Sequence, residues 1–204
     1  TLYGGPGSGK TNLCLVAAVS QAKKGNRVLY VDTEGGFSVD RVKQLVEENS
    51  DAVLGNILLL KPTTFLEQQE AFKTILKEIT KDHLGLIIVD GMTMLYRLEF
   101  AEARKKDVSE MQEVNGELTR QMRILAEIAR KQGIPVIVTN QVYNWEKESR
   151  MVGGDILRYW SKCLIELIND NGKRSAFLRK HRSLPEKRLD FQIVNEGVKK
   201  RGWL

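Results

Sequence analysis

The chain has 204 residues, of which 42% are hydrophobic and 28% are charged. This composition is typical of a soluble globular domain and excludes a disordered, collagen-like or disulfide-rich chain. No apolar run approaches the roughly 20 residues of a membrane span, so we expect a cytoplasmic protein. The net charge of +6 permits an anionic partner without requiring one. The two cysteines, Cys14 and Cys163, lack metal-ligand spacing and fit a reducing compartment.

Residues 4 to 11 read GGPGSGKT and match G-x-x-x-x-G-K-[ST], the phosphate-binding P-loop. Glycines let successive backbone N–H groups point inward at phosphate oxygens. Lys10 reaches the β- and γ-phosphates, and the Thr11 hydroxyl is a ligand for Mg²⁺. A glycine-rich turn without a ligand is the weaker interpretation, because the motif lies between an apolar start and a helical run. The predicted nucleotide-binding residues are Gly4, Gly5, Pro6, Gly7, Ser8, Gly9, Lys10, Thr11 and Asn12.

Hydrophobic periodicity and capping signals predict the elements that follow. Only three residues precede the P-loop, where a full strand is usual, so we expect upstream residues to be missing. Buried strands are predicted at 27–32, 56–60, 84–90 and 136–140. Helices are predicted at 10–22, after Ser38, after Thr64, and from about residue 108 to 133.

Two segments are predicted as loops with cations and aromatic side chains, the first at 91–107 and the second at 142–156. Beyond them, residues 163–168 and 175–179 are predicted as a hairpin joined at Asn171-Gly172. Residues 189–193 alternate as a final strand, and 199–201 form a solvated tail. The alternation of strand and helix up to about residue 140 indicates a single α/β domain. We expect a mostly parallel sheet with helices on both faces, extended by antiparallel C-terminal strands.

In such a sheet, the loops at the carboxyl ends of the strands meet at one ligand crevice. Three polar residues then converge on the P-loop. Asp90 follows the apolar run LIIV and fits the Walker-B carboxylate that holds Mg²⁺, directly or through water. Glu34 is positioned to activate a water, and Gln141 to hydrogen-bond the γ-phosphate and signal to the following loop. Asp32 also ends a strand and is the alternative to Glu34.

Several strings together resemble a known family. VDTEGGF (Val31 to Phe37) is similar to the catalytic-glutamate loop of RecA-like recombinases. LYR, LTRQMRIL, VTNQV and the Gly153-Gly154 pair resemble the core of archaeal RadA and its eukaryotic relatives. RKHRSLPE (Arg179 to Glu186) and the short first loop look most like the archaeal RadB paralogues. The resemblance implies a RecA-like P-loop NTPase core that acts in homologous recombination and DNA repair.

Roles carry over from this resemblance to matching positions. Lys10, Glu34 and Gln141 are implied as catalytic residues, with Thr11 and Asp90 at the Mg²⁺ ion and ATP as the nucleotide. The chain has no helix-hairpin-helix DNA-binding domain, and its second loop is charged rather than glycine-rich, which favours a regulatory paralogue with low turnover. DNA, a recombinase or repair-protein partner and further copies of the chain are the expected partners, with no membrane.

DNA contacts are expected to be directed mainly at phosphates, with aromatic side chains stacking on bases. The candidates are Arg97, Arg104, Lys105, Lys106, Tyr143, Trp145, Lys147 and Arg150. Lys180 and Arg182 are expected to complete the ATP site of a neighbouring subunit, as an arginine finger does, or else to form a basic edge that touches DNA. Two other functions remain open: an ATP-bound partner-binding module with negligible hydrolysis, and a KaiC-type signalling ATPase.

Overall fold

The computed structural model describes residues 1–46, 48–80, 84–145 and 148–202, with only the backbone of 144, 145 and 148–150. Within these residues the helices are α1 (Lys10–Ala22), α2 (Val39–Leu45), α3 (Ser50–Gly55), α4 (Phe65–Glu78), α5 (Met94–Lys106), α6 (Val108–Lys131) and α7 (Gly154–Trp160). The strands there are β1 (Leu2–Gly4), β2 (Arg27–Asp32), β3 (Ile57–Leu60), β4 (Leu84–Asp90), β5 (Val136–Trp145), β6 (Glu148–Met151), β7 (Leu164–Asp170), β8 (Lys173–Lys180), β9 (Lys187–Val194) and β10 (Gly197–Lys200).

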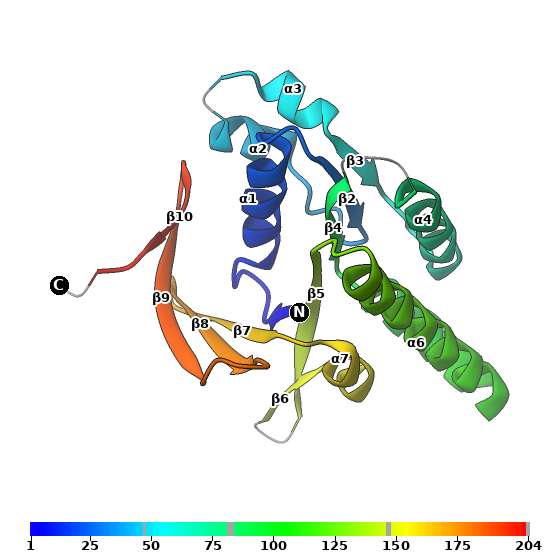
Figure 1. Cartoon of the computed structure of the whole chain (residues 1–204). Coiled ribbons are helices and arrows are strands. Elements are labelled where there is room, and N and C mark those ends of the chain that lie inside the picture. Colours follow the sequence, from blue (N-terminus) through cyan, green and yellow to red (C-terminus); the bar gives the residue numbers. More distant parts are fainter. Residues whose placement is uncertain (47, 81–83, 146–147, 203–204) are drawn as a thin grey trace.

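One sheet runs through the described part of the chain in the order β10-β9-β8-β7-β1-β5-β4-β2-β3, with β6 paired to β5 (Figure 1). The strands from β7 to β3 are parallel, and β8, β9 and β10 are antiparallel to their neighbours. The short strand β1 lies in the middle, between β5 and β7. The P-loop therefore leaves the sheet at its centre. The expected α/β class and mostly parallel sheet are confirmed.

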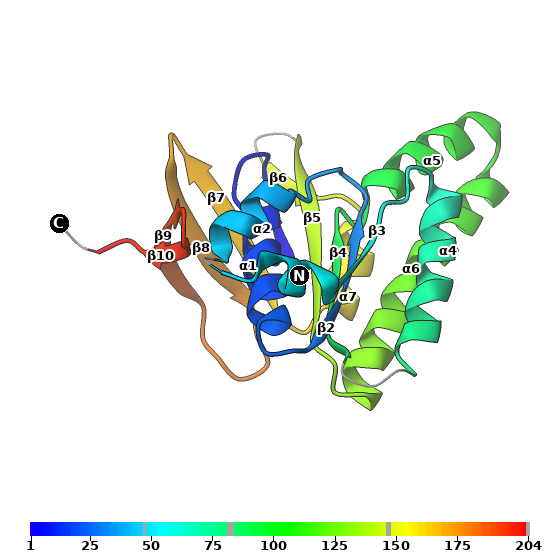
Figure 2. The same ribbon diagram turned by 90° about the horizontal axis from the view of Figure 1, so that it is seen from above.

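Helices cover both faces of the parallel strands (Figure 2). On one face, α1, α2 and α3 enclose a core that includes Leu15, Tyr30 and Ile88. On the other face, α4, α5, α6 and α7 pack over a larger core that includes Phe72, Ile87 and Leu118. These buried residues come from the apolar runs and helical stripes of the sequence, so burial of those runs explains why the layers form.

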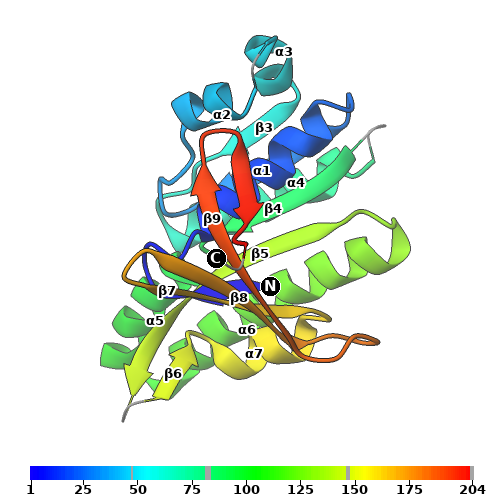
Figure 3. The same ribbon diagram turned by 90° about the vertical axis from the view of Figure 1, so that its left-hand side faces the viewer.

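The C-terminal strands curl away from the parallel sheet, and the β9–β10 hairpin crosses over α1 (Figure 3). Arg41 on α2 fixes this arrangement, because its guanidinium donates to the carbonyl oxygens of Val194 at 2.7 Å and Asn195 at 3.1 Å. Its Nε also donates to Asn12 Oδ1 at 3.0 Å, so one side chain joins the hairpin to the helix that follows the P-loop.

Four expectations about the loops and the C-terminus were wrong. Most of the expected loop 91–107 is helix α5, and the segment 142–156 contains the end of β5, strand β6 and the start of α7. Strand β7 is parallel to β1, so only the later C-terminal strands are antiparallel. Lys199 and Lys200 belong to β10, which pairs with β9, rather than to a solvated tail. Helix α3 was not predicted at all.

Candidate nucleotide site

The P-loop follows β1 directly and leads into α1. Gly9, the residue before the helix, has φ of 105°, a conformation that L side chains rarely adopt. Ser8 is buried, and its hydroxyl oxygen has no hydrogen-bond partner among the described residues. A buried polar atom without a partner is costly, and a phosphate oxygen is a suitable acceptor for that hydroxyl. The loop is therefore shaped to receive an oxyanion.

Lys10 lies over this loop and is only 7% exposed. Its ammonium donates to the carbonyl oxygens of Gly4 at 2.9 Å and Gly5 at 3.0 Å. Burial lowers the pKa of the ammonium, while the nearby carboxylates of Glu34 and Asp90 act in the opposite direction. Among the described residues, the side chain is thus held inside the site by bonds to the P-loop, and a phosphate can replace those carbonyl oxygens.

Asp90 ends β4 on the neighbouring side of the crevice and is 1% exposed. Its Oδ2 accepts from the Tyr30 hydroxyl at 2.8 Å, and its Oδ1 accepts from Thr139 Oγ1 at 2.6 Å. Two neutral donors, one on β2 and one on β5, therefore fix the orientation of the Asp90 carboxylate. Sequence reasoning missed both donors; the available signal was that a buried tyrosine hydroxyl needs a polar partner.

Glu34 and Gln141 meet at the open edge of the same crevice. Gln141 Nε2 donates to Glu34 Oε1 at 3.0 Å. Partial burial and the charge of Asp90 raise the pKa of the Glu34 carboxyl, against the opposing effects of Lys10 and the Gln141 bond. A raised carboxyl pKa makes a better proton acceptor near neutral pH. Gln141 lies within β5 rather than after it, because the strand continues to Trp145.

Asp32, the alternative to Glu34, is engaged elsewhere. Its two carboxylate oxygens accept from the backbone N–H groups of Gly36 at 3.1 Å and Phe37 at 2.9 Å. Asp32 is 2% exposed, and these two bonds shape the loop that carries Glu34. The two candidate carboxylates therefore differ in their partners: Asp32 accepts from the backbone of its own loop, and Glu34 accepts from Gln141.

The residues present fit ATP with Mg²⁺. The orphaned hydroxyl of Ser8, the buried ammonium of Lys10 and the N-terminus of α1 form a set suited to phosphates. The Thr11 hydroxyl and the Asp90 carboxylate are oxygen ligands of the kind that Mg²⁺ prefers. The side chain of Asn12, also predicted to bind nucleotide, accepts the bond from Arg41, and its contact with nucleotide stays a prediction.

The predicted DNA contacts lie on α5, on β5 and in the segment that contains β6. Arg97 and Arg104 are exposed on α5 seven positions apart, which is about two helical turns and places them on one face. Lys105 and Lys106 pair with Glu102 at 2.6 Å and Glu110 at 2.8 Å. Tyr143 on β5 is 43% exposed. The prediction for Lys147, and those for the side chains of Trp145 and Arg150, lie outside the described residues.

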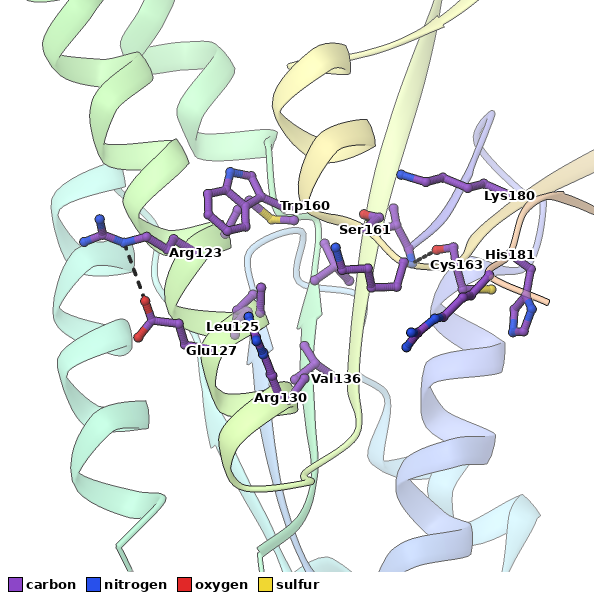
Figure 4. Close-up of a pocket in the computed structure, with 17 residues that line it drawn as sticks. Arg123, Leu125, Glu127, Arg130, Val136, Trp160, Ser161, Cys163, Lys180 and His181 are labelled. Carbon is purple, nitrogen blue, oxygen red and sulfur yellow. Dashed lines mark hydrogen bonds and ion pairs between the residues drawn. The ribbon is translucent and has the colours of Figure 1, made fainter.

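Lys180 and Arg182 lie at the opposite end of the sheet from the P-loop. They line a groove of about 1070 Å³ at the amino ends of the parallel strands, beside α6 and Trp160 (Figure 4). Lys180 Nζ donates to the carbonyl oxygen of Arg158 at 2.6 Å. Neither cation is brought to the nucleotide crevice of its own chain, so a role in ATP binding requires a second subunit.

The comparison with known families settles the class of this core. The model of the Rad51 family matches residues 1–201. The chain belongs to the Rad51 family. It is 42% identical over 97% of its length to the DNA repair and recombination protein RadB of Methanobrevibacter smithii, of which the match covers 85%. It is 38% identical to RadB of Methanocaldococcus jannaschii, of which 90% is covered.

A solved RadB recombinase structure has the same architecture, with a TM-score of 0.78 and 34% identity. The match covers 97% of this chain and 87% of that structure. The resemblance stated from VDTEGGF, VTNQV and RKHRSLPE is confirmed, as is the RecA-like core. Members of the Rad51 family are nucleotide-binding ATPases, which agrees with the crevice described above. Among the described residues, no helix combines the length and apolarity needed to span a bilayer.

Proposed function

We propose that this Rad51-family protein binds ATP with Mg²⁺, hydrolyses it slowly, and uses the nucleotide to control DNA binding in homologous recombination and repair. The observation that carries the proposal is the bond between Gln141 Nε2 and Glu34 Oε1 at 3.0 Å, opposite the buried Lys10. It joins a proton acceptor to a residue of β5, the strand that continues into the second candidate DNA segment. The names of the relatives support the recombination and repair role.

In the proposed mechanism, each side chain at the nucleotide site has a separate role. Lys10 leaves the carbonyl oxygens of Gly4 and Gly5 and holds the terminal phosphates. Thr11 and Asp90 would hold Mg²⁺, and the bound ion would neutralise part of the phosphate charge. Glu34 accepts the proton of the attacking water. When ATP binds, Gln141 can exchange Glu34 for a phosphate oxygen, which makes β5 sensitive to the nucleotide.

One experiment separates this function from its alternatives. We expect measurable ATP hydrolysis that changes when single-stranded DNA is added, together with DNA binding that weakens steeply as salt rises. ATP binding without hydrolysis would indicate the partner-binding module. Hydrolysis without any DNA binding would indicate a KaiC-type signalling ATPase.

The DNA contacts on α5 give a quantitative prediction. Because Arg97 and Arg104 share one face of the helix, replacing both with alanine should remove two phosphate contacts and lower the log–log salt slope for single-stranded DNA by roughly 1.4. The Lys73→Ala/Lys131→Ala variant makes the same change in net charge at exposed positions on α4 and α6, and it serves as the control. Equal slopes for the two variants would contradict a specific role for α5.

The position of Lys180 and Arg182 supports a contact in trans. A Lys180→Ala/Arg182→Ala protein and a Glu34→Gln protein should each hydrolyse ATP poorly. An equal mixture should regain up to about a quarter of the wild-type rate, since a head-to-tail site needs one intact partner on each side. The rate is measured in assemblies shown to contain both variants. No recovery there would contradict the trans role, and normal hydrolysis with weak DNA binding would indicate a basic edge that touches DNA.

A further inference from the structure

Asn140 is a buried polar residue of β5 that lies next to Gln141 in the chain. It is 0% exposed, and both ends of its amide are used. Its Oδ1 accepts a hydrogen bond from Thr93 Oγ1, and its Nδ2 donates to the carbonyl oxygen of Val152 at 2.8 Å. Thr93 immediately precedes α5, and Val152 immediately follows β6. One side chain therefore joins the starting point of the first candidate DNA element to the end of the second.

The neighbours of Asn140 on β5 contact the nucleotide crevice instead. Thr139 Oγ1 donates to Asp90, and Gln141 Nε2 donates to Glu34. Successive side chains of a strand point to opposite faces of the sheet, so Asn140 points to the other face. Three consecutive residues thus connect two carboxylates of the site, on one face, to two DNA-facing segments, on the other.

A second set of contacts brings the same two segments together. The backbone N–H of Val152 donates to the carbonyl oxygen of Gln141 at 3.2 Å. At Gly153, where φ is 62°, an added Cβ would lie 3.5 Å from Thr93 Cγ2 and 3.2 Å from Leu118 Cδ2. The end of the second segment is therefore packed closely against the residue that precedes α5.

We infer that Asn140 is a positioning residue that makes α5 and the β6 segment respond together to the nucleotide. The inference rests on the proposed function, since it assumes that ATP changes the Gln141–Glu34 contact. When Gln141 moves toward a phosphate, β5 moves with it, and the Asn140 amide carries that shift to Thr93 and Val152 at once. The two candidate DNA elements then form one unit rather than two independent loops.

Hydrogen exchange with and without a non-hydrolysable ATP analogue and Mg²⁺ tests this inference. In the wild type, the analogue should slow exchange in the P-loop, in residues 94–106 and in residues 148–153, by about fivefold or more in the last two, the lower end of the usual coupling between sites. In Asn140→Ala the P-loop response should remain and both distant responses should be lost. In Thr93→Val, which keeps the side-chain shape, only the response of 94–106 should be lost.

The Asn56→Ala variant provides the matched control. Asn56 Nδ2 also donates to a backbone carbonyl, that of Ala22 at 3.1 Å, but at the end of α1 away from the site. All three responses should persist in it. If Asn140→Ala and Thr93→Val respond as the wild type does, or if the distant segments of the wild type ignore the analogue, the inference is wrong. If the P-loop itself shows no response in the wild type, the proposed function fails instead.

Discussion

Replacing Lys10 with alanine is expected to abolish ATP binding without unfolding the protein. In the proposed site the ammonium is the charge that meets the terminal phosphates, and its described bonds run to the carbonyl oxygens of Gly4 and Gly5. Burial lowers the pKa of the Lys10 ammonium, which means that the charged group is poorly solvated in the folded protein. Removing this charge should therefore not destabilise the nucleotide-free protein. The variant should therefore differ from the wild type in stability only when nucleotide is present.

Thermal unfolding with and without ATP and Mg²⁺ measures this effect. At a ligand concentration one hundred times Kd, the wild type should gain about 2.7 kcal/mol of stability, and Lys10→Ala should gain none. Lys23→Ala is the matched control, because Lys23 follows the same helix and its ammonium also donates to a backbone carbonyl, that of Leu45 at 3.0 Å. An ATP affinity in Lys10→Ala equal to that of the control would contradict the P-loop assignment.

Replacing Glu34 with glutamine is expected to preserve ATP binding and to slow hydrolysis by about 10²- to 10⁴-fold, the usual contribution of a general base. Glutamine keeps the size of the side chain and loses only the ability to accept a proton. The wild-type rate should also fall as the pH drops through the raised pKa of Glu34, since the protonated carboxyl is no longer a base. The Glu34→Gln variant has no carboxyl at this position, so its residual rate should not show this fall at low pH.

Asp32→Asn separates the two carboxylates. Asp32 accepts from the N–H groups of Gly36 and Phe37, so asparagine should loosen the loop and lower the melting temperature. Glu34→Gln should leave the melting temperature unchanged. If Asp32→Asn were the more damaging to turnover while the protein remained as stable as the wild type, the wrong carboxylate would have been chosen. An undetectable wild-type rate would favour the partner-binding module.

The elements that periodicity predicted were those with a continuous apolar signal. The run LIIV and the stripe Val114, Leu118, Leu125 give β4 and α6, because a buried face must be apolar wherever it packs. Helix α5 gave no such signal: its described buried side chains are few and its last turn holds three cations. It is held by tertiary contacts, such as the bond from the Tyr96 hydroxyl to Asn115 Oδ1 at 2.7 Å, which the local sequence cannot reveal.

The residues of the nucleotide site likewise divide into those that the sequence could predict and those that it could not. Lys10, Glu34 and Asp90 could be proposed from spacing, because a motif or a strand end marks each of them. Tyr30, Thr139 and Asn140 could not, since their roles depend on which strands are neighbours in the sheet. Strand β7 illustrates the reason: it was expected to extend the sheet as an antiparallel strand, but it pairs in parallel with β1, which brings Ile165 beside Leu2.

The central place of β1 has a consequence for how the chain folds. Its partners are Thr139 on β5 and Ile165 on β7, both more than half of the chain away from Leu2. Pairings of such long range are slow to form, because the entropy of closing the intervening chain is lost before the contacts are gained. During synthesis the P-loop is made before β5 and β7, yet its strand can be enclosed on both sides only after β7 has been made. The segment that carries the P-loop motif is therefore among the last to reach its final surroundings.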